Sequence, residues 1–222
     1  MTNSRNDRAE LATARASVYG LLADIFREEP SEALLSGLRD KQFSEALNSL
    51  GLSLDEMFEG ASPDKLIEDL ALEYTRLFLG PGSHISPNES MHVEARYGEP
   101  NSLWSTQTVA VKKFMEAAGV AIEDSFSGMP DHITAEFEFM QLLLLKEAEA
   151  WTDGDEDLGA NVQQILKQFY DEHLSQWVGN FSDKVMAVAE LPFYGQMAEV
   201  TKSFMKFEGE IFAVELPACA VG

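Results

Sequence analysis

The chain has 222 residues, which is long enough for one large domain with a buried core. It carries 16 Lys and Arg against 38 Asp and Glu, so the formal net charge of −22 disfavours nucleic acid and anionic membranes as partners and favours a basic one. Hydrophobic residues make up 45% of the chain, which excludes wholesale disorder.

Neither disulfides nor export signals are indicated. The single cysteine, Cys219, excludes an intrachain disulfide and a cysteine-based metal site within one chain. The N-terminal residues lack the apolar stretch and cleavage site of a secretory signal. The longest aliphatic run, Leu142 to Leu145, is far shorter than the ~20 residues that span a bilayer. We therefore expect a cytoplasmic protein with no stable membrane insertion.

The N-terminal part has helical periodicity. Apolar residues at spacings of seven, four and three predict a first helix that ends at Pro30: Leu11, Val18, Leu22 and Ile25. Ser31 is placed to cap a short second helix, and another is expected around residues 43–50. Ser62 followed by Pro63 then predicts the start of a helix that ends at Gly80.

Residues 80–100 have no periodicity and contain several Gly and Pro residues, which predicts a long loop. Four further helices are expected, from Asn101 or Ser102 to Gly119, from Pro130 to about Trp151, over 158–179 and over 182–208. No alternating strand is found. We predict an all-α fold, a single helical bundle of about eight to ten helices with an N-terminal lobe (1–79), a hinge loop (80–100), a C-terminal lobe (101–210) and a tail (211–222).

Motifs for metal or nucleophile chemistry are weak. The acidic loop 153–157 resembles the start of an EF-hand, but Leu158 and Gln164 stand where Gly and Glu are required. The four histidines form no metal-binding motif: His84, His92, His132 and His173. We expect no catalytic site, metal or cofactor.

Two segments admit both a structural and a functional interpretation. Pro130 and Asp131 are typical of a helix start, where the helix dipole favours a carboxylate, and His132 would lie beside them within reach of a ligand. Apolar residues before the long loop are typical of a core, yet they could also form a rim at its base: Tyr74, Leu77 and Phe78.

Ordered landmarks give the chain a resemblance. An E-Y-x-R-L-F-x-G-P-G stretch is followed by P-x-E-S, by P-D-H-I with E-x-E-F-M, and by F-Y-x-x-H-L-x-x-W. These stretches begin at Glu73, Pro87, Pro130 and Phe169. Together they resemble the TorD/DmsD/NarJ family of redox-enzyme maturation chaperones, and the TorD/DmsD branch more closely than the nitrate-reductase branch.

The resemblance implies a non-enzymatic function. Family members bind the twin-arginine signal peptide of a molybdopterin enzyme and hold that enzyme until its cofactor is inserted. The residues that it associates with signal-peptide binding are Tyr74, Leu77, Phe78, Pro87, Glu89, Ser90, Asp131 and His132. Asn88 stands where the family often has an aromatic residue.

The expected partner is therefore the twin-arginine leader and apo-form of a molybdopterin-dependent reductase, such as a dimethyl sulfoxide or trimethylamine N-oxide reductase. A basic and then apolar leader is complementary to an acidic helical protein with an apolar crevice. The alternative is a metal-dependent hydrolase that uses Asp131 and His132 as a ligand pair. Both a monomer and a dimer swapped through the long loop are compatible with the sequence.

Overall fold

The computed structural model describes residues 2–38, 62–80, 82, 84–93, 102–120 and 128–215. The helix predicted at 43–50 and Cys219 lie outside these ranges. Within them, the all-α prediction is confirmed, because every regular element is helical and the one β-type contact is an isolated bridge between Asn88 and His132.

The elements follow one another in chain order. The α-helices are α1 (Thr2–Arg27), α2 (Glu32–Leu38), α5 (Pro63–Tyr74), α6 (Thr106–Ala117), α7 (Ile133–Asp153), α8 (Glu156–Phe169), α9 (Ser175–Val188) and α10 (Pro192–Glu215). Two π-helical turns, η1 (Thr75–Leu79) and η3 (Tyr170–Leu174), continue α5 and α8. A 3₁₀ turn, η2, spans Glu89–Met91.

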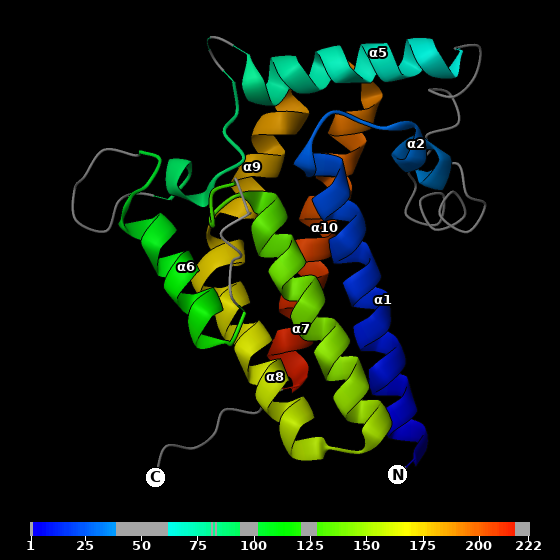
Figure 1. The fold of residues 1–222 in the computed structure, drawn as a ribbon, viewed down its shortest axis with the longest axis vertical. Helices are drawn as coiled ribbons and strands as arrows, with labels where there is room; N and C mark the ends of the chain where they lie inside the picture. Colours follow the sequence, from blue (N-terminus) through cyan, green and yellow to red (C-terminus); the bar gives the residue numbers. More distant parts are fainter. Residues whose placement is uncertain are drawn as a thin grey trace.

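The long helices form one bundle around α7. Helix α1 packs along α7, α7 packs against α8, and α9 packs against α10, while α5 crosses one end of the bundle (Figure 1). Buried residues face in several directions from α7, among them Phe137, Met140 and Leu144, because this helix has neighbours on more than one side. Residues from the predicted N-terminal lobe (1–79) and C-terminal lobe (101–210) therefore share one core, and the division into two lobes stays a prediction.

Local signals determine several helix starts as predicted. Ser62 Oγ accepts a hydrogen bond from the backbone N–H of Lys65 at 3.3 Å, with Pro63 at the first helical position. Ser31 Oγ accepts from Leu34 N at 3.2 Å. A further cap was not predicted: in the acidic loop, Asp155 accepts from Leu158 N at 3.0 Å, and α8 begins at Glu156 rather than at Leu158.

Other boundaries were predicted wrongly. Helix α6 begins at Thr106, with Ser105 as its cap, and Trp104 lies in the preceding turn with a positive φ of 62°. Helix α7 begins at Ile133 rather than at Pro130. The break predicted between residues 179 and 182 does not exist, because burial of Trp177 and Phe181 on either side holds Gly179 within α9.

The chain turns instead at residues 189–191, before Pro192 at the start of α10. Of the helices in the described ranges, none has a long enough stretch of apolar residues to cross a bilayer.

Candidate functional site

The aromatic and aliphatic residues before the long loop belong to the core. Tyr74, Leu77 and Phe78 are only 3%, 2% and 3% exposed. The Phe78 ring contacts Phe26 and Phe181 with ring centroids 6.0 Å apart in both pairs. The core interpretation is confirmed and the interpretation of these side chains as an open rim is wrong, because the last residue of α5, Tyr74, and the π turn η1 place all three side chains inside the bundle. Their part in leader binding stays a prediction.

The same turn holds the end of α1. The Tyr74 hydroxyl donates to the carbonyl oxygen of Phe26 at 3.1 Å, and Thr75 Oγ1 donates to Glu29 Oε1 at 2.9 Å. Burial raises the pKa of Tyr74 to about 12, so the hydroxyl keeps its proton and remains a donor. The first landmark stretch thus positions residues that follow α1.

The segment 84–93 lies against the start of α7. The backbone N–H of Glu89 donates to the carbonyl of Asp131 at 2.9 Å, and Ile133 N donates to the carbonyl of Pro87 at 2.8 Å. Asp131 Oδ2 accepts from Ser90 N at 3.0 Å. Asp131 therefore precedes α7 instead of lying in its first turn, and its fully buried carboxylate holds the segment in place rather than facing solvent.

His132 is the N-cap of α7. Its Nδ1 accepts from Thr134 N at 3.2 Å, which places the proton of the neutral ring on Nε2. Burial lowers the pKa of His132 to about 4, and the nearby Arg27 charge lowers it further while Asp131 opposes the shift. The imidazole is therefore neutral near pH 7, as this cap requires.

All later landmarks meet in one buried polar group, here called the motif cluster: Glu89, Ser90, Asp131, Glu136, His173 and Trp177. His173 Nδ1 donates to Glu89 Oε2 at 3.0 Å, and Trp177 Nε1 donates to Glu136 Oε2 at 3.1 Å. Glu89 Oε1 also accepts from Gln107 Nε2 at 2.5 Å. The π turn η3 carries His173 to this position.

Three members of the motif cluster were not predicted as site residues. Glu136, His173 and Trp177 each lie within a landmark stretch, and that shared membership was the available signal. The sequence alone did not indicate that they meet, because the contacts join residues up to 84 positions apart.

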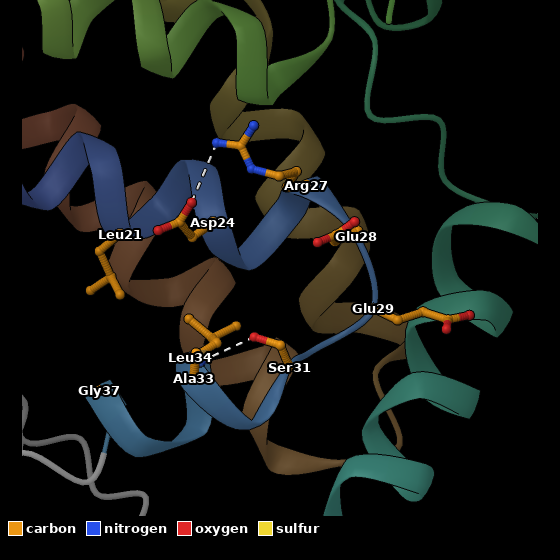
Figure 2. A pocket seen from close by; sticks show the side chains of 9 residues that line it. All are labelled: Leu21, Asp24, Arg27, Glu28, Glu29, Ser31, Ala33, Leu34 and Gly37. Carbon is orange, nitrogen blue, oxygen red and sulfur yellow. Dashed lines mark hydrogen bonds and ion pairs between the residues drawn. The ribbon is translucent and has the colours of Figure 1, made fainter. Parts of the chain in front are cut away.

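A surface pocket lies beside the end of α1. It has a volume of about 400 Å³, and its walls come from α1, α2 and the turn between them: Leu21, Asp24, Arg27, Glu28, Glu29, Ser31, Ala33, Leu34 and Gly37. Figure 2 shows Leu21 and Leu34 on one side, with Glu28 and Glu29 on the connecting segment. We call it the acidic pocket. Sequence reasoning missed it, although two adjacent acids before Pro30 were the signal.

One cation lies in the acidic pocket. The Arg27 guanidinium contacts Asp24 Oδ1 at 3.3 Å and Glu138 Oε1 at 2.5 Å. The pocket adjoins the landmarks, because Thr134 Oγ1 donates to the carbonyl of Ala23 at 3.3 Å and Thr75 holds Glu29. It therefore combines carboxylates, an apolar wall and an internal arginine.

The histidines do not converge. His84 is exposed, His92 Nε2 lies 2.7 Å from the carbonyl of Ser86, and His173 lies with Glu89. Within the described ranges, no three His, Cys, Asp or Glu side chains are grouped so that they could hold a metal ion. No structural observation favours the hydrolase alternative.

Comparisons with known proteins identify the family. The family model described as nitrate reductase delta subunit matches residues 37–183. The chain belongs to this family. The chaperone protein TorD of Shewanella pealeana is 26% identical over 215 residues, which cover 91% of each chain. TorD of Photobacterium profundum is 26% identical over 206 residues, covering 87% of this chain and 92% of that protein.

The resemblance predicted from the landmarks is thereby confirmed, and the named relatives are chaperones and not enzymes. A crystal structure of a provisionally assigned redox enzyme maturation protein from Archaeoglobus fulgidus is 21% identical. It matches 88% of this chain and 93% of that chain, with a TM-score of 0.47.

Proposed function

We propose that this chain is a cytoplasmic maturation chaperone. It binds the twin-arginine leader of a molybdopterin-dependent oxidoreductase and holds the apoenzyme until the cofactor is inserted. Membership of a family with chaperone relatives supports the general function. The acidic pocket is the single observation that supports the leader as the ligand, because its carboxylates and apolar wall complement a basic and then apolar peptide.

The leader arginines would pair with carboxylates beside the end of α1. A guanidinium presents a planar fork of donors that suits carboxylate oxygens, which a lysine ammonium does not. Asp24, Glu28 and Glu29 supply those oxygens, while Leu21 and Leu34 offer contact to the apolar part. The net charge of −22 adds long-range attraction for a basic peptide.

The eight residues predicted from the resemblance would act mainly by supporting the acidic pocket from the interior. Tyr74, Leu77 and Phe78 pack the turn that supports Glu29, and Pro87, Glu89, Ser90 and Asp131 join the loop to α7. His132 caps α7 beside Arg27. In this proposal their substitution weakens binding by disturbing the support of the pocket.

The test is a titration of a twin-arginine leader peptide into the purified protein, at low and at high salt. A triple variant, Asp24→Asn with Glu28→Gln and Glu29→Gln, should bind about tenfold more weakly at low salt, with less salt dependence. The matched control is Asp157→Asn with Glu149→Gln and Glu199→Gln, which removes three exposed carboxylates outside the pocket. Equal affinity of the triple variant and the control would overturn the proposed site, and no binding by the wild type would overturn the function.

Arg27 provides a second arm of the same test. Its guanidinium already occupies Asp24 and Glu138, so it competes with an incoming arginine. Arg27→Gln should therefore tighten leader binding by several-fold, whereas Arg5→Gln, in an exposed pair with Glu156, should change it little. Unchanged or weaker binding by the Arg27 variant would contradict the placement of the leader.

A further inference from the structure

The motif cluster contains three carboxyl groups that are shielded from water. Glu89, Asp131 and Glu136 are each 0% exposed. The described residues offer these groups one hydrogen-bonded basic partner, His173, which contacts Glu89. Burying an ionised carboxylate without a cation costs free energy. One histidine cannot balance the charge of three carboxylates, so the cluster is balanced only if protons are bound to carboxyl groups.

The donors in the cluster do not satisfy every oxygen. Glu136 Oε1 and Asp131 Oδ1 are buried, and no described residue donates a hydrogen bond to either atom. Asp131 has one donor, Ser90 N, and Glu136 has one, Trp177 Nε1. An acid in this setting is stabilised by becoming a donor itself.

Glu136 is the group best placed to hold a proton. Burial raises its pKa well above the usual range, and the charges of Glu89 and Asp131 and a hydrogen bond with the Glu89 side chain raise it further. The Trp177 hydrogen bond acts in the opposite direction. A hydrogen bond between two carboxyl groups requires that one of them is protonated.

We propose that a proton on Glu136, shared with Glu89, latches the segment 84–93 to the start of α7, and that its loss at alkaline pH releases the segment. The acidic groups that face this proton are Glu89 from η2 and Asp131 from the turn before α7, and His173 from η3 lies on Glu89. Helix α9 contributes the neutral Trp177, and α6 contributes the neutral Gln107 on the far side of Glu89.

Release would affect a defined set of contacts. Near the proton, the segment is attached by the Glu89 side chain and by hydrogen bonds at Glu89 N, Ser90 N and the Pro87 carbonyl. It is also held by Ile85 N, which donates to the carbonyl of Leu77 at 2.7 Å, and by His92, whose Nδ1 lies 3.2 Å from Lys184 Nζ. Without the proton, Glu89 and Glu136 would repel each other across a site of low polarity, while the contacts further along α7 and α9 would persist. The opening is therefore local.

The direction of the pH effect follows from proton linkage. A carboxyl whose pKa is raised in the closed state binds its proton more tightly there than in the open state. Closure then weakens as the pH rises above the ordinary carboxyl pKa, and the opening constant increases by up to tenfold per pH unit until the closed state also loses the proton.

The experiment is hydrogen exchange of the segment 84–93 from pH 6 to pH 9, with rates divided by their intrinsic values. In the wild type, the opening constant should rise with pH. Glu136→Gln, whose amide donates a hydrogen bond without a titrating proton, should remove that rise. The matched control is Glu208→Gln, another fully buried position whose partner is Arg15, and it should leave the rise intact.

Infrared spectroscopy detects the protonated carboxyl group directly and can be read in the wild type alone if a variant folds poorly. The wild type at neutral pH should show the carbonyl band of a protonated buried carboxyl, and that band should be lost in Glu136→Gln. Absence of the band, or a pH-independent opening constant in the wild type, would overturn the latch. Both measurements are made without a leader peptide, so the latch is tested separately from the proposed function.

One consequence does rest on the proposed function. In that proposal Pro87, Glu89, Ser90 and Asp131 support the acidic pocket from the interior, so release of the segment would disturb the pocket. Leader affinity should then fall several-fold from neutral to alkaline pH in the wild type but not in Glu136→Gln. A pH-independent affinity would disconnect the latch from binding, while the exchange result would still decide the latch itself.

Discussion

Two groups of buried charged side chains hold this bundle together, and they balance charge in different ways. In the first, Arg15 on α1 makes a two-point contact with Glu208 on α10, with Nε–Oε1 and Nη2–Oε2 distances of 2.7 and 2.8 Å. Arg15 also lies 3.8 Å from Glu147 on α7, and the Tyr19 hydroxyl donates to Glu208 at 3.2 Å. In the second, the motif cluster, three carboxyls face one histidine.

The comparison indicates what each group is suited to do. An arginine stays ionised throughout the physiological range, so the cation at the centre of the Arg15 group keeps its charge. A carboxyl that is balanced by a proton changes its charge with pH. The first group joins three long helices within the bundle, whereas the second lies where a loop meets a helix start, which is where a local change costs least.

The largest expected effect is the loss of the arginine. Arg15→Met would remove the cation that makes the two-point contact with the buried Glu208 carboxylate, which should lower the free energy of unfolding by about 3–5 kcal/mol. Urea unfolding at pH 7, followed by circular dichroism, measures it. Lys65→Gln, in an exposed pair with Asp69, is the control and should change little. A loss in the Arg15 variant no greater than in this control would show that the two groups do not differ as described.

A smaller effect is expected at the edge of the motif cluster. The pKa of His132 falls from its usual 6.5 to about 4 in the folded chain. The neutral ring therefore stabilises the fold above pH 6.5, and this contribution of about 3 kcal/mol is lost as the pH falls from 6.5 to 4. His132→Asn keeps an N-cap that does not titrate. Its stability relative to the wild type should improve progressively as the pH falls over that interval, and a constant difference would contradict a neutral, half-buried His132 cap.

The smallest expected effect is the difference between two tryptophan donors, Trp177 in the motif cluster and Trp151 in the Arg15 group. Trp177→Phe removes the described donor to Glu136, whereas Trp151→Phe removes the 2.9 Å bond to Glu147 but leaves Gln163 at 2.8 Å. Trp177 and Trp151 are 1% and 2% exposed, so the packing loss is similar. Trp177→Phe should cost about 1 kcal/mol more. Equal costs in thermal unfolding would show that the motif cluster is satisfied from elsewhere.

How much the sequence could predict depends on the range of the interaction. Ser31, Ser62 and Pro63 act within one turn of their own helices, and their starts were predicted correctly. The start of α7 was misplaced by three residues because Asp131 belongs to a turn held by the 84–93 segment, where its carbonyl accepts from Glu89 N and its carboxylate accepts from Ser90 N.

The candidate site was harder to predict for the same reason. The landmarks identified the family, but they carried no information on which side chains are sealed inside. Periodicity could not separate a buried Tyr74 from an exposed one, and the acidic pocket depends on how α2 returns toward α1. Such arrangements are set by packing between distant segments, which a single sequence does not display.

The π turn η3 has a consequence for how this chain varies among its relatives. A π turn holds one more residue than an α turn and fits that residue in without rotating the helix on either side. Deleting one residue from Tyr170–Leu174 would therefore preserve the inward faces of α8 and α9 while removing the bulge that presents His173. Correct alignment of a relative without the bulge needs a gap of one position there.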